Sequence, residues 1–203
     1  MFEQLLVSSA PVANPDFVVV PSNEFITGSA LTTLTGLDAQ TGKGSLMPQA
    51  DTTPWLLIRD GGNTFMIPQK PLRYYITRAA LVNSGLRGGK QVTIAGCVWS
   101  VRLFKGANLA TSEWNKYMYS ICDGNFIPPP PKRYATYTYA ELGLTEVGNL
   151  GITTHVYETI SGGFYVRGNN GSIGYINTLQ NTEVFNSTGW RPILEYVSGE
   201  LPW

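Results

Sequence analysis

Glycine and proline interrupt this chain so often that long helices have little room to form. There are 22 glycines and 13 prolines among 203 residues. Glycine favours turns, and proline removes a backbone hydrogen-bond donor, so the apolar segments between them stay short. Short apolar runs bounded by turn residues are typical of strands and hairpins. The sequence therefore excludes a helix bundle, and its length predicts one domain, with or without an arm.

Charged residues are scarce and unevenly spread. They make up 14% of the chain, against about 25% in an average soluble domain. Residues 59–133 carry eleven bases and three acids, whereas residues 1–58 carry one base and five acids and residues 134–203 carry two and six. A basic middle is compatible with nucleic-acid binding, but these bases are scattered rather than clustered. We therefore expect complementary charge between segments or subunits, and no nucleic-acid partner.

The first residues lack the pattern of a secretory signal. Glu3 stands where such a signal carries positive charge, and the apolar run beside it is short. No stretch approaches the roughly 18 apolar residues of a membrane span. We expect a protein made in the cytoplasm of a host cell, without a signal peptide and without a membrane partner. In that setting Cys97 and Cys122, which lack metal-ligand spacing, are expected to be buried thiols.

Residues 1–53 differ in composition from the remainder. A short strand is expected at 17–20, and Thr-, Gly- and Ser-rich stretches with little periodicity follow it. The apolar content around Phe2, Leu5 and Leu6 is too high for a solvated linker. We predict that 1–53 is an extended N-terminal arm that orders against a neighbouring subunit, and that 54–203 form the domain.

From residue 54 onward the local signals are clearer. Hairpins are predicted at 55–67 around the turn at 60–63, and at 91–104 around Gly96. Short helices are predicted within 75–86, capped by Thr77, and from Ser112 onward. A capping box, Thr138 to Glu141, predicts a further short helix that ends at Gly143. Further strands are expected at 152–158, 164–167, 173–177 and 190–197.

Alternation within these elements predicts a core. Cys97, Trp99, Val101 and Leu103 share one face of a strand. The helix that begins at Ser112 carries Trp114, Tyr117, Met118 and Ile121 on one stripe. We expect Trp99, Trp114 and Trp190 to be core residues. Tyr134, Tyr137 and Tyr139 are candidates for a sugar-stacking face or a subunit interface.

Signals for catalysis or cofactor binding are weak. His155 is the only histidine and lies in an alternating strand pattern, so a packed or surface role is expected. Neither 36–44 nor 168–174 has the spacing and context of a phosphate-binding loop. A pair of catalytic carboxylates, as in glycosidases, stays open as a minor alternative, because the sequence alone does not exclude that two of four acids meet in space. These acids are Asp60, Glu113, Asp123 and Glu158. We predict no catalytic residues, no cofactor and no metal site, and name no binding residues.

Four pieces in order resemble a domain of tailed-bacteriophage virion proteins, in particular tail-associated and other surface structural proteins. The pieces are the Trp55 hairpin with Ile67-Pro-Gln-Lys-Pro-Leu-Arg73, then Gly89-Lys-Gln-Val-Thr-Ile-Ala-Gly96 with Val101-Arg-Leu103, then Ser112-Glu-Trp114, and finally Gly189-Trp-Arg-Pro-Ile-Leu194. The resemblance covers about residues 55–197. It implies a virion protein that acts by assembly.

The closing Gly-Trp-Arg-Pro element also resembles C-type-lectin-like domains of the formylglycine-generating-enzyme kind. This resemblance implies that the last strand, 190–197, lies beside the region near Trp55, and that Arg191 pairs with an acid. The reactive cysteines of that enzyme lie near its C-terminus, unlike Cys97 and Cys122. The Trp-Asn-Asp motif of calcium-dependent lectins is matched here only by Trp114-Asn-Lys116. The resemblance therefore implies the scaffold, without the enzyme activity or the calcium site.

These observations together predict an α+β, mostly β, C-type-lectin-like domain preceded by an N-terminal arm. The expected function is that of a bacteriophage virion structural protein, either a tail or fibre component or a capsid decoration protein. Its expected partners are other virion proteins and copies of itself, with a trimer as one form. The alternative is an adhesin that binds a glycan of the host surface. An enzyme, such as a depolymerase or a deviant formylglycine-type oxidase, is the third hypothesis, and the chain is expected not to be an enzyme.

Overall fold

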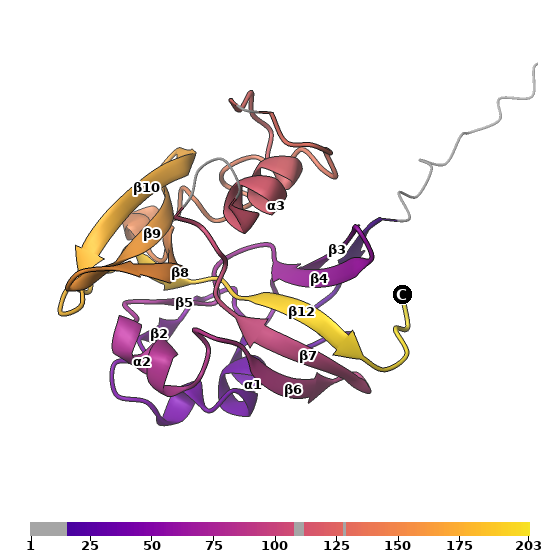
Figure 1. Cartoon of the computed structure of the whole chain (residues 1–203), viewed down its shortest axis with the longest axis horizontal. Helices are drawn as coiled ribbons and strands as arrows, with labels where there is room; N and C mark the ends of the chain where they lie inside the picture. Colours follow the sequence, from indigo (N-terminus) through magenta and orange to yellow (C-terminus); the bar gives the residue numbers. More distant parts are fainter. Residues whose placement is uncertain (1–15, 108–111, 128) are drawn as a thin grey trace, which may run out of the picture.

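The structure is a computed structural model that describes residues 16–107, 112–127 and 129–203. It has 15% helix and 37% strand, so the fold is α+β and mostly β, as predicted. The strands form two six-stranded sheets that lie side by side, with short helices around them (Figure 1). Residues 1–15 of the predicted N-terminal arm lie outside the described residues.

The first sheet has the order β1-β3-β4-β12-β7-β6, and all its neighbouring strands are antiparallel. Its strands are β1 (Phe17–Val20), β3 (Trp55–Asp60), β4 (Asn63–Pro68), β6 (Lys90–Ile94), β7 (Cys97–Arg102) and β12 (Ile193–Ser198). The two hairpins predicted from the sequence are β3–β4 and β6–β7. The last strand, β12, lies between them and joins them into one sheet.

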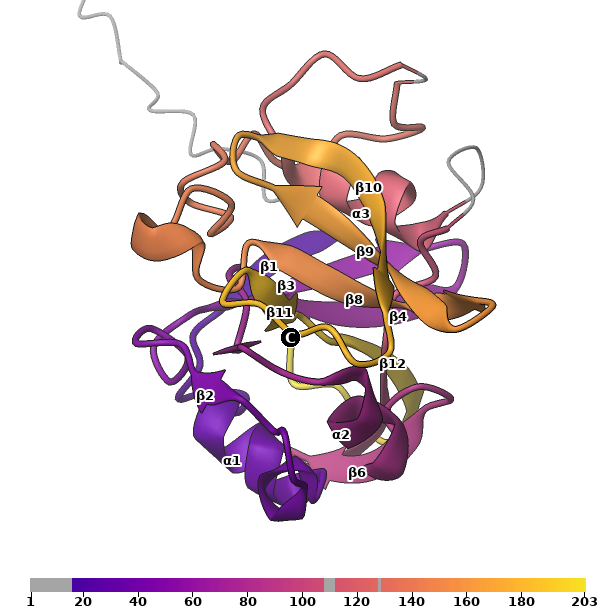
Figure 2. The same ribbon diagram turned by 90° about the vertical axis from the view of Figure 1, so that its left-hand side faces the viewer.

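The second sheet has the order β10-β9-β8-β11-β5-β2. Its strands are β2 (Ser45–Leu46), β5 (Arg73–Tyr74), β8 (Thr153–Ile160), β9 (Gly163–Asn169), β10 (Ser172–Gln180) and β11 (Thr188–Trp190). Only the β8–β11 pair within it is parallel. The meander β8–β9–β10 carries most of this sheet and faces the viewer in Figure 2.

The described residues form three α-helices, each with a side-chain cap at its start. They are α1 (Gly28–Leu34), α2 (Arg78–Asn83) and α3 (Glu113–Ile121), and two short 3-10 helices, Leu37–Ala39 and Val147–Asn149, accompany them. The side-chain oxygens of Thr27, Thr77 and Ser112 each accept a hydrogen bond from the backbone N–H of the residue three positions later. The predicted caps of α2 and α3 are thus confirmed. In Figure 2, α3 lies near β10, while α1 and α2 lie near β6.

Strand β3 shows how the layers are built, because it is buried on both faces. Trp55 and Leu57 belong to one core, which β3 shares with β7, α1 and α2. Leu56 and Ile58 belong to the other core, which they share with α3 and the second sheet. Successive residues of a strand point to opposite faces, so the first sheet is the middle layer of the molecule.

Residues 16–53 differ from the extended arm expected over 1–53. Strand β1 pairs in register with β3, from Phe17 with Ile58 to Val20 with Trp55. Leu31 and Leu37 are fully buried in the same core as Trp55. The apolar residues of this segment have partners far along the chain, which local sequence patterns do not reveal. The segment 16–53 is therefore part of the domain, and the arm predicted for 1–15 lies outside the described residues.

Two local predictions also need correction. The capping box forms, with the Thr138 backbone N–H donating to Glu141 at 2.8 Å, yet the chain makes only turns there instead of a helix. The strand expected at 190–197 is broken, because Pro192 follows Arg191 and has no N–H for a ladder. Its halves, β11 and β12, lie in different sheets, so the chain passes between the sheets at this point.

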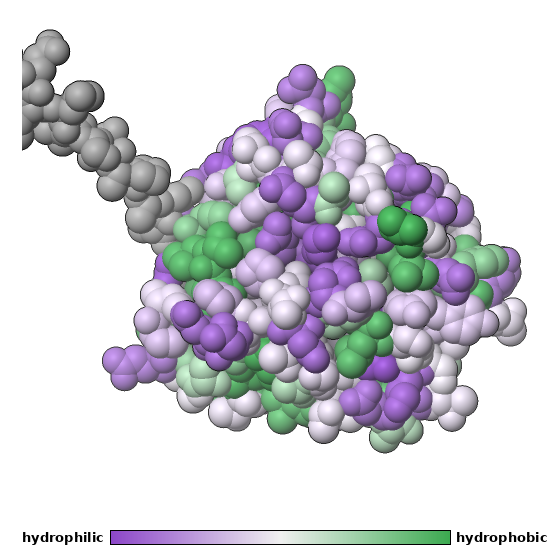
Figure 3. Space-filling view, turned by 180° about the vertical axis from the view of Figure 1, so that it is seen from behind, coloured by the Kyte–Doolittle hydropathy of each residue, from purple (hydrophilic) through white to green (hydrophobic). Residues whose placement is uncertain are grey.

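Part of the uneven charge is neutralised within the chain, as the sequence predicted. Bases of the basic middle pair with acids of the two acidic ends in Lys70–Glu146, Arg73–Asp38, Arg102–Glu195 and Lys132–Asp16. The surface stays polar despite the low charge. Seen from behind, hydrophobic side chains form separate patches between hydrophilic ones (Figure 3). The most exposed large ones, Ile127 and Val147, lie in separate segments, Ile127 after α3 and Val147 at the start of the second 3-10 helix.

Candidate functional site

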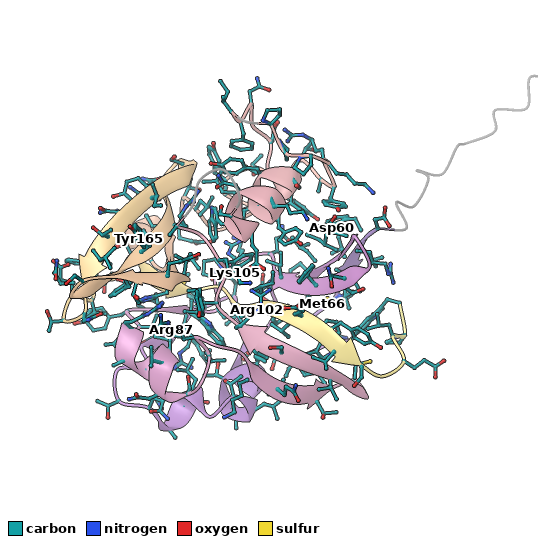
Figure 4. The ribbon with its side chains drawn as sticks, viewed as in Figure 1. Asp60, Met66, Arg87, Arg102, Lys105 and Tyr165 are labelled. Carbon is teal, nitrogen blue, oxygen red and sulfur yellow. The ribbon has the colours of Figure 1, made fainter. Side chains whose placement is uncertain are left out.

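A polar hollow lies where the two sheets meet, and we call it the seam hollow. It measures about 330 Å³. The lining residues used below are Arg87, Ser100, Arg102, Lys105, Tyr157 and Glu195. They come from both sheets and from the two segments that follow α2 and β7. Figure 4 shows Arg87, Arg102 and Lys105 around the region between β8 and the β7–β12 pair.

The floor of the seam hollow is set by the alternation of β7. Trp99 and Val101 point into the first core, so Ser100 and Arg102 point to the opposite face. The register places Glu195 of β12 opposite Ser100. The hollow thus lies on the face of the first sheet that is turned away from that core.

Arg102 is the most firmly held cation of the site. Its two terminal nitrogens donate to the two carboxylate oxygens of Glu113, at 2.7 and 2.8 Å, and Nε donates to Glu195 at 3.0 Å. Burial opposes the charge of Arg102, but its bonds to and attraction by the two carboxylates outweigh burial and raise its pKa. Arg102 is therefore a fixed positive charge that joins β7, β12 and the start of α3.

Arg87 and Lys105 have more freedom than Arg102. The Arg87 guanidinium lies over the Tyr157 ring, 5.2 Å from its centroid, and donates to the Tyr157 carbonyl at 3.3 Å. Lys105 is exposed, and its ammonium makes no hydrogen bond or ion pair within the part of the chain that the structure describes. Both side chains can therefore turn toward a ligand in the seam hollow.

A second layer of charge lies behind these residues. Arg78 donates to the carbonyls of Val156 and Tyr157, and burial, followed by repulsion from Arg87, lowers its pKa to about 10. The Glu158 carboxylate accepts from the backbone N–H groups of Gly106 and Ala107 at 2.9 and 3.2 Å. These bonds fix the strand β8 and the turn after Lys105 relative to each other.

The charges at the seam hollow nearly balance but leave a positive excess. The bases of the lining are Arg87, Arg102 and Lys105, and the acids are Glu195 and the Glu113 that binds Arg102, so the lining with Glu113 has an excess of one positive charge. Lys105, the most mobile of these bases, lies at the rim. Behind the lining, Arg78 and Arg167 both interact with Glu158. Chemically this arrangement can hold a monoanion, and Glu195 and Ser100 add acceptors for hydroxyl groups.

The single histidine lies away from the seam hollow and is packed inside the fold, as predicted. His155 is fully buried, stacks on Phe164 with centroids 4.7 Å apart, and has Nε2 3.0 Å from the Ile76 carbonyl oxygen. Burial, and then the charge of Arg78, lower its pKa to about 3. The imidazole is therefore neutral, and its Nε2–H donates to Ile76.

Both cysteines are buried free thiols, as predicted. Burial, and then the charge of Asp123, raise the pKa of Cys122 to about 11. A thiol with a raised pKa holds little of the reactive thiolate at neutral pH. Cys97 donates weakly to the Glu200 carbonyl at 3.2 Å and lies in the first core.

Three of the four carboxylates left open by the sequence have separate partners. Asp60 accepts from Tyr117 at 3.1 Å and pairs with Lys116. Glu113 is bound to Arg102, and Glu158 to backbone N–H groups. Asp123 is exposed at the end of α3. Two of them, Glu113 and Glu158, lie near the seam hollow as structural partners of its bases and backbone.

The aromatic candidates divide into two groups. Trp99, Trp114 and Trp190 are fully buried, which confirms the prediction that they are core residues. Tyr134, Tyr137 and Tyr139 are half-buried against the second core, and Tyr134 stacks on Phe17 with centroids 6.2 Å apart. Their expected role in a sugar-stacking face or an interface stays a prediction.

Two other hollows are present on the described surface. One, of about 320 Å³, surrounds the β3–β4 turn and is lined by Asp60, Lys132 and Tyr134, among others. A smaller one, of about 190 Å³, lies on the second sheet beside Tyr175 and Phe185.

Within residues 16–107, 112–127 and 129–203, no cluster of His, Cys, Asp and Glu is suited to a metal ion. In the same residues, no helix is long and apolar enough to span a membrane.

The residues of the seam hollow were not identified from the sequence. The alternation of β7 did carry a signal, because it places Ser100 and Arg102 opposite the apolar face. Arg87 and Tyr157 carried no such signal in the sequence, since they reach the site only when the second sheet packs beside the first.

Comparison of the chain with protein-family models, with curated proteins and with solved structures finds no match.

Proposed function

We propose that this chain is a structural protein of a bacteriophage virion, with a C-type-lectin-like domain, and that it acts through contacts between subunits. The observation that carries the proposal is the convergence of the four resembling pieces on shared cores. Each contributes a fully buried tryptophan, from Trp55 of β3, Trp99 of β7, Trp114 of α3 and Trp190 of β11. This supports reading the four pieces as one domain.

The path of the C-terminal segment also supports the C-type-lectin-like scaffold. The last strand lies inside the first sheet, and the Trp203 ring contacts Phe25 with centroids 5.5 Å apart. The Arg59 side chain donates to the Trp203 carbonyl. The C-terminal residues thus lie against the first elements of the domain. On the side of Trp55, β12 pairs with β4 and not with β3, the strand of Trp55, which differs in detail from the expected pairing.

Assembly through residues 1–15 gives the first prediction. Removing 1–15 leaves β1 and the Asp16–Lys132 ion pair in place, so we expect a folded protein that incorporates into particles at least tenfold less. Removing 1–20 deletes β1 and the buried Val20, so that variant is expected to be less stable. Incorporation is measured by immunoblot of purified particles, and unfolding by thermal scans. Normal incorporation of the 1–15 deletion contradicts the assembly role of this segment.

Immunogold labelling of particles with an antibody against the domain tests the virion setting itself. Gold on the head supports a decoration protein, and gold on the tail supports a tail or fibre component. Particles that stay unlabelled, although the protein is abundant in infected cells, contradict the proposed function.

The second candidate function is an adhesin that binds a glycan of the host surface. The seam hollow favours it, because a polar hollow with an aromatic wall and paired donors and acceptors suits a sugar ring. Binding by the purified chain to glycans, with and without charge, tests this function independently of assembly.

A further inference from the structure

We infer that the seam hollow binds a sugar that carries a single carboxylate, such as a hexuronic acid unit of a surface polysaccharide. This inference rests on the second candidate function and specifies its ligand. It does not depend on the assembly role proposed first.

The size of the hollow suits one sugar ring. Ligand pockets of proteins have volumes of about 300–1,000 Å³, and the seam hollow lies at the lower end with about 330 Å³. Its walls differ in chemistry. One side is aromatic through Tyr157, which is 39% exposed and has the Arg87 guanidinium over its ring, and the β7–β12 side is polar through Ser100 and Glu195. A ring with apolar C–H groups and several hydroxyls matches such a pair of walls.

The charge of the lining suits a carboxylate. The N–H groups of Arg102 are taken up by Glu113, Glu195 and the Leu103 carbonyl, so Arg102 offers none to a ligand. Arg87 and Lys105 remain to contact a ligand directly. A single carboxylate neutralises the one excess positive charge of the lining.

The polar neighbours of the cations distinguish a sugar acid from a simple anion. The Glu195 side chain is 38% exposed, and Arg102 uses only one of its oxygens, Oε2. The other oxygen of Glu195 can accept from a sugar hydroxyl, and Ser100 can donate or accept. A small anion such as acetate has no group for these positions, and close to Glu195 it is repelled.

Opposite charge changes at two positions give a sharp test. Lys105→Gln removes the excess positive charge, and we expect it to weaken the binding of glucuronate about tenfold. Glu195→Gln removes a negative charge and keeps an acceptor for Arg102, so we expect severalfold tighter binding. Lys116→Gln is the matched control, because it removes an exposed lysine outside the hollow and is expected to leave affinity unchanged. Affinities of the full chain are measured by NMR titration, with thermal scans of each variant.

Other ligands and salt complete the test. We expect glucose to bind at least tenfold more weakly than glucuronate, and added salt to weaken glucuronate binding. Equal affinity for the two sugars, or an unchanged affinity of Lys105→Gln, overturns the inference. Tighter binding of acetate or inorganic phosphate than of glucuronate reduces the seam hollow to a general anion site and also overturns it. Loss of binding in Tyr175→Ala but not in Lys105→Gln moves the sugar site to the hollow on the second sheet.

The outcome is separable from that of the assembly proposal. Lys105→Gln is expected to incorporate into particles normally. Particles that contain the chain, combined with no glucuronate binding, overturn only the present inference. Binding of glucuronate by a chain that is absent from particles overturns the virion proposal and leaves the sugar-acid site standing.

Discussion

Replacement of Arg191 by methionine is expected to lower the free energy of unfolding by about 3 kcal/mol. Arg191 is fully buried where the chain passes from the second sheet to the first. Its guanidinium donates to the Gln69 carbonyl at 2.9 Å and to the Leu142 carbonyl. A hydrogen bond from a charged donor contributes about 1.5–3 kcal/mol, and a buried carbonyl left without a partner costs about 1–3 kcal/mol.

A term of opposite sign limits this loss. Burial lowers the pKa of Arg191 to about 9, which means that the charged form is held in an unfavourable place. Methionine removes that charge and fills a similar elongated space. The lost bonds to two segments far apart in the chain outweigh this gain, because each of them fixes an irregular segment onto the core.

Urea unfolding of wild type, Arg191→Met and Arg191→Lys measures the balance. Lysine keeps the charge but lacks the planar fork of nitrogens, so the Arg191→Lys protein is expected to be less stable than wild type. For a chain of this length, a loss of about 3 kcal/mol lowers the melting temperature by about 6–12 °C. An Arg191→Met protein that is as stable as wild type contradicts the role given to these two bonds.

The same arginine illustrates what the sequence could not predict. The resemblance implied that Arg191 pairs with an acid. Within the described part of the chain, however, its hydrogen bonds go to two backbone carbonyls, and its one other polar contact is the Met118 sulfur, at 3.9 Å. Carbonyl oxygens are present at every residue, so composition gives no sign of which of them an arginine will meet. Arg78 behaves in the same way toward Val156 and Tyr157.

Local patterns with a single partner face were predicted well. The alternation of β7 and the stripe of α3 each required only that one side meet a core, and the structure buries those sides. The caps Thr77 and Ser112 bond within their own turn, so the sequence contains all that determines them. The capping box at Thr138 forms for the same reason, but so short a segment before Gly143 cannot sustain a helix by local bonds alone.

Long-range contacts explain the failures. Residues 16–53 have little periodicity, and their burial depends on β3, β5 and β7, which follow later in the chain. The seam hollow depends on the packing of one sheet beside the other. Tyr157 reaches it because β8 is joined to the segment just after β7, where the Tyr157 backbone N–H donates to the Phe104 carbonyl at 2.7 Å. No spacing in the sequence indicates that contact.

Acid is expected to destabilise this protein through His155 by about 3 kcal/mol between pH 7 and pH 4. The unfolded imidazole binds a proton below pH 6.5, whereas the buried one does so only below about pH 3. Within this window the unfolded state holds more protons than the folded state, so the free energy of unfolding falls as the pH is lowered. The slope from this one group approaches 1.4 kcal/mol per pH unit.

His155→Gln isolates this contribution, because a glutamine amide can still donate to the Ile76 carbonyl and does not titrate. Carboxylates also titrate near pH 4, but they do so in both proteins, so the difference between their stability curves reports His155. We expect the variant to lose stability less steeply than wild type below pH 6.5, as measured by urea unfolding at pH 7, 6, 5 and 4. Since the chain has one histidine, its imidazole NMR signal can be followed without assignment, and in the folded state it should not shift between pH 7 and 5. Parallel stability curves, or a histidine signal that titrates near pH 6.5, contradict the buried neutral imidazole, because a proton taken up in that range requires water to reach the ring between Phe164 and Ile76.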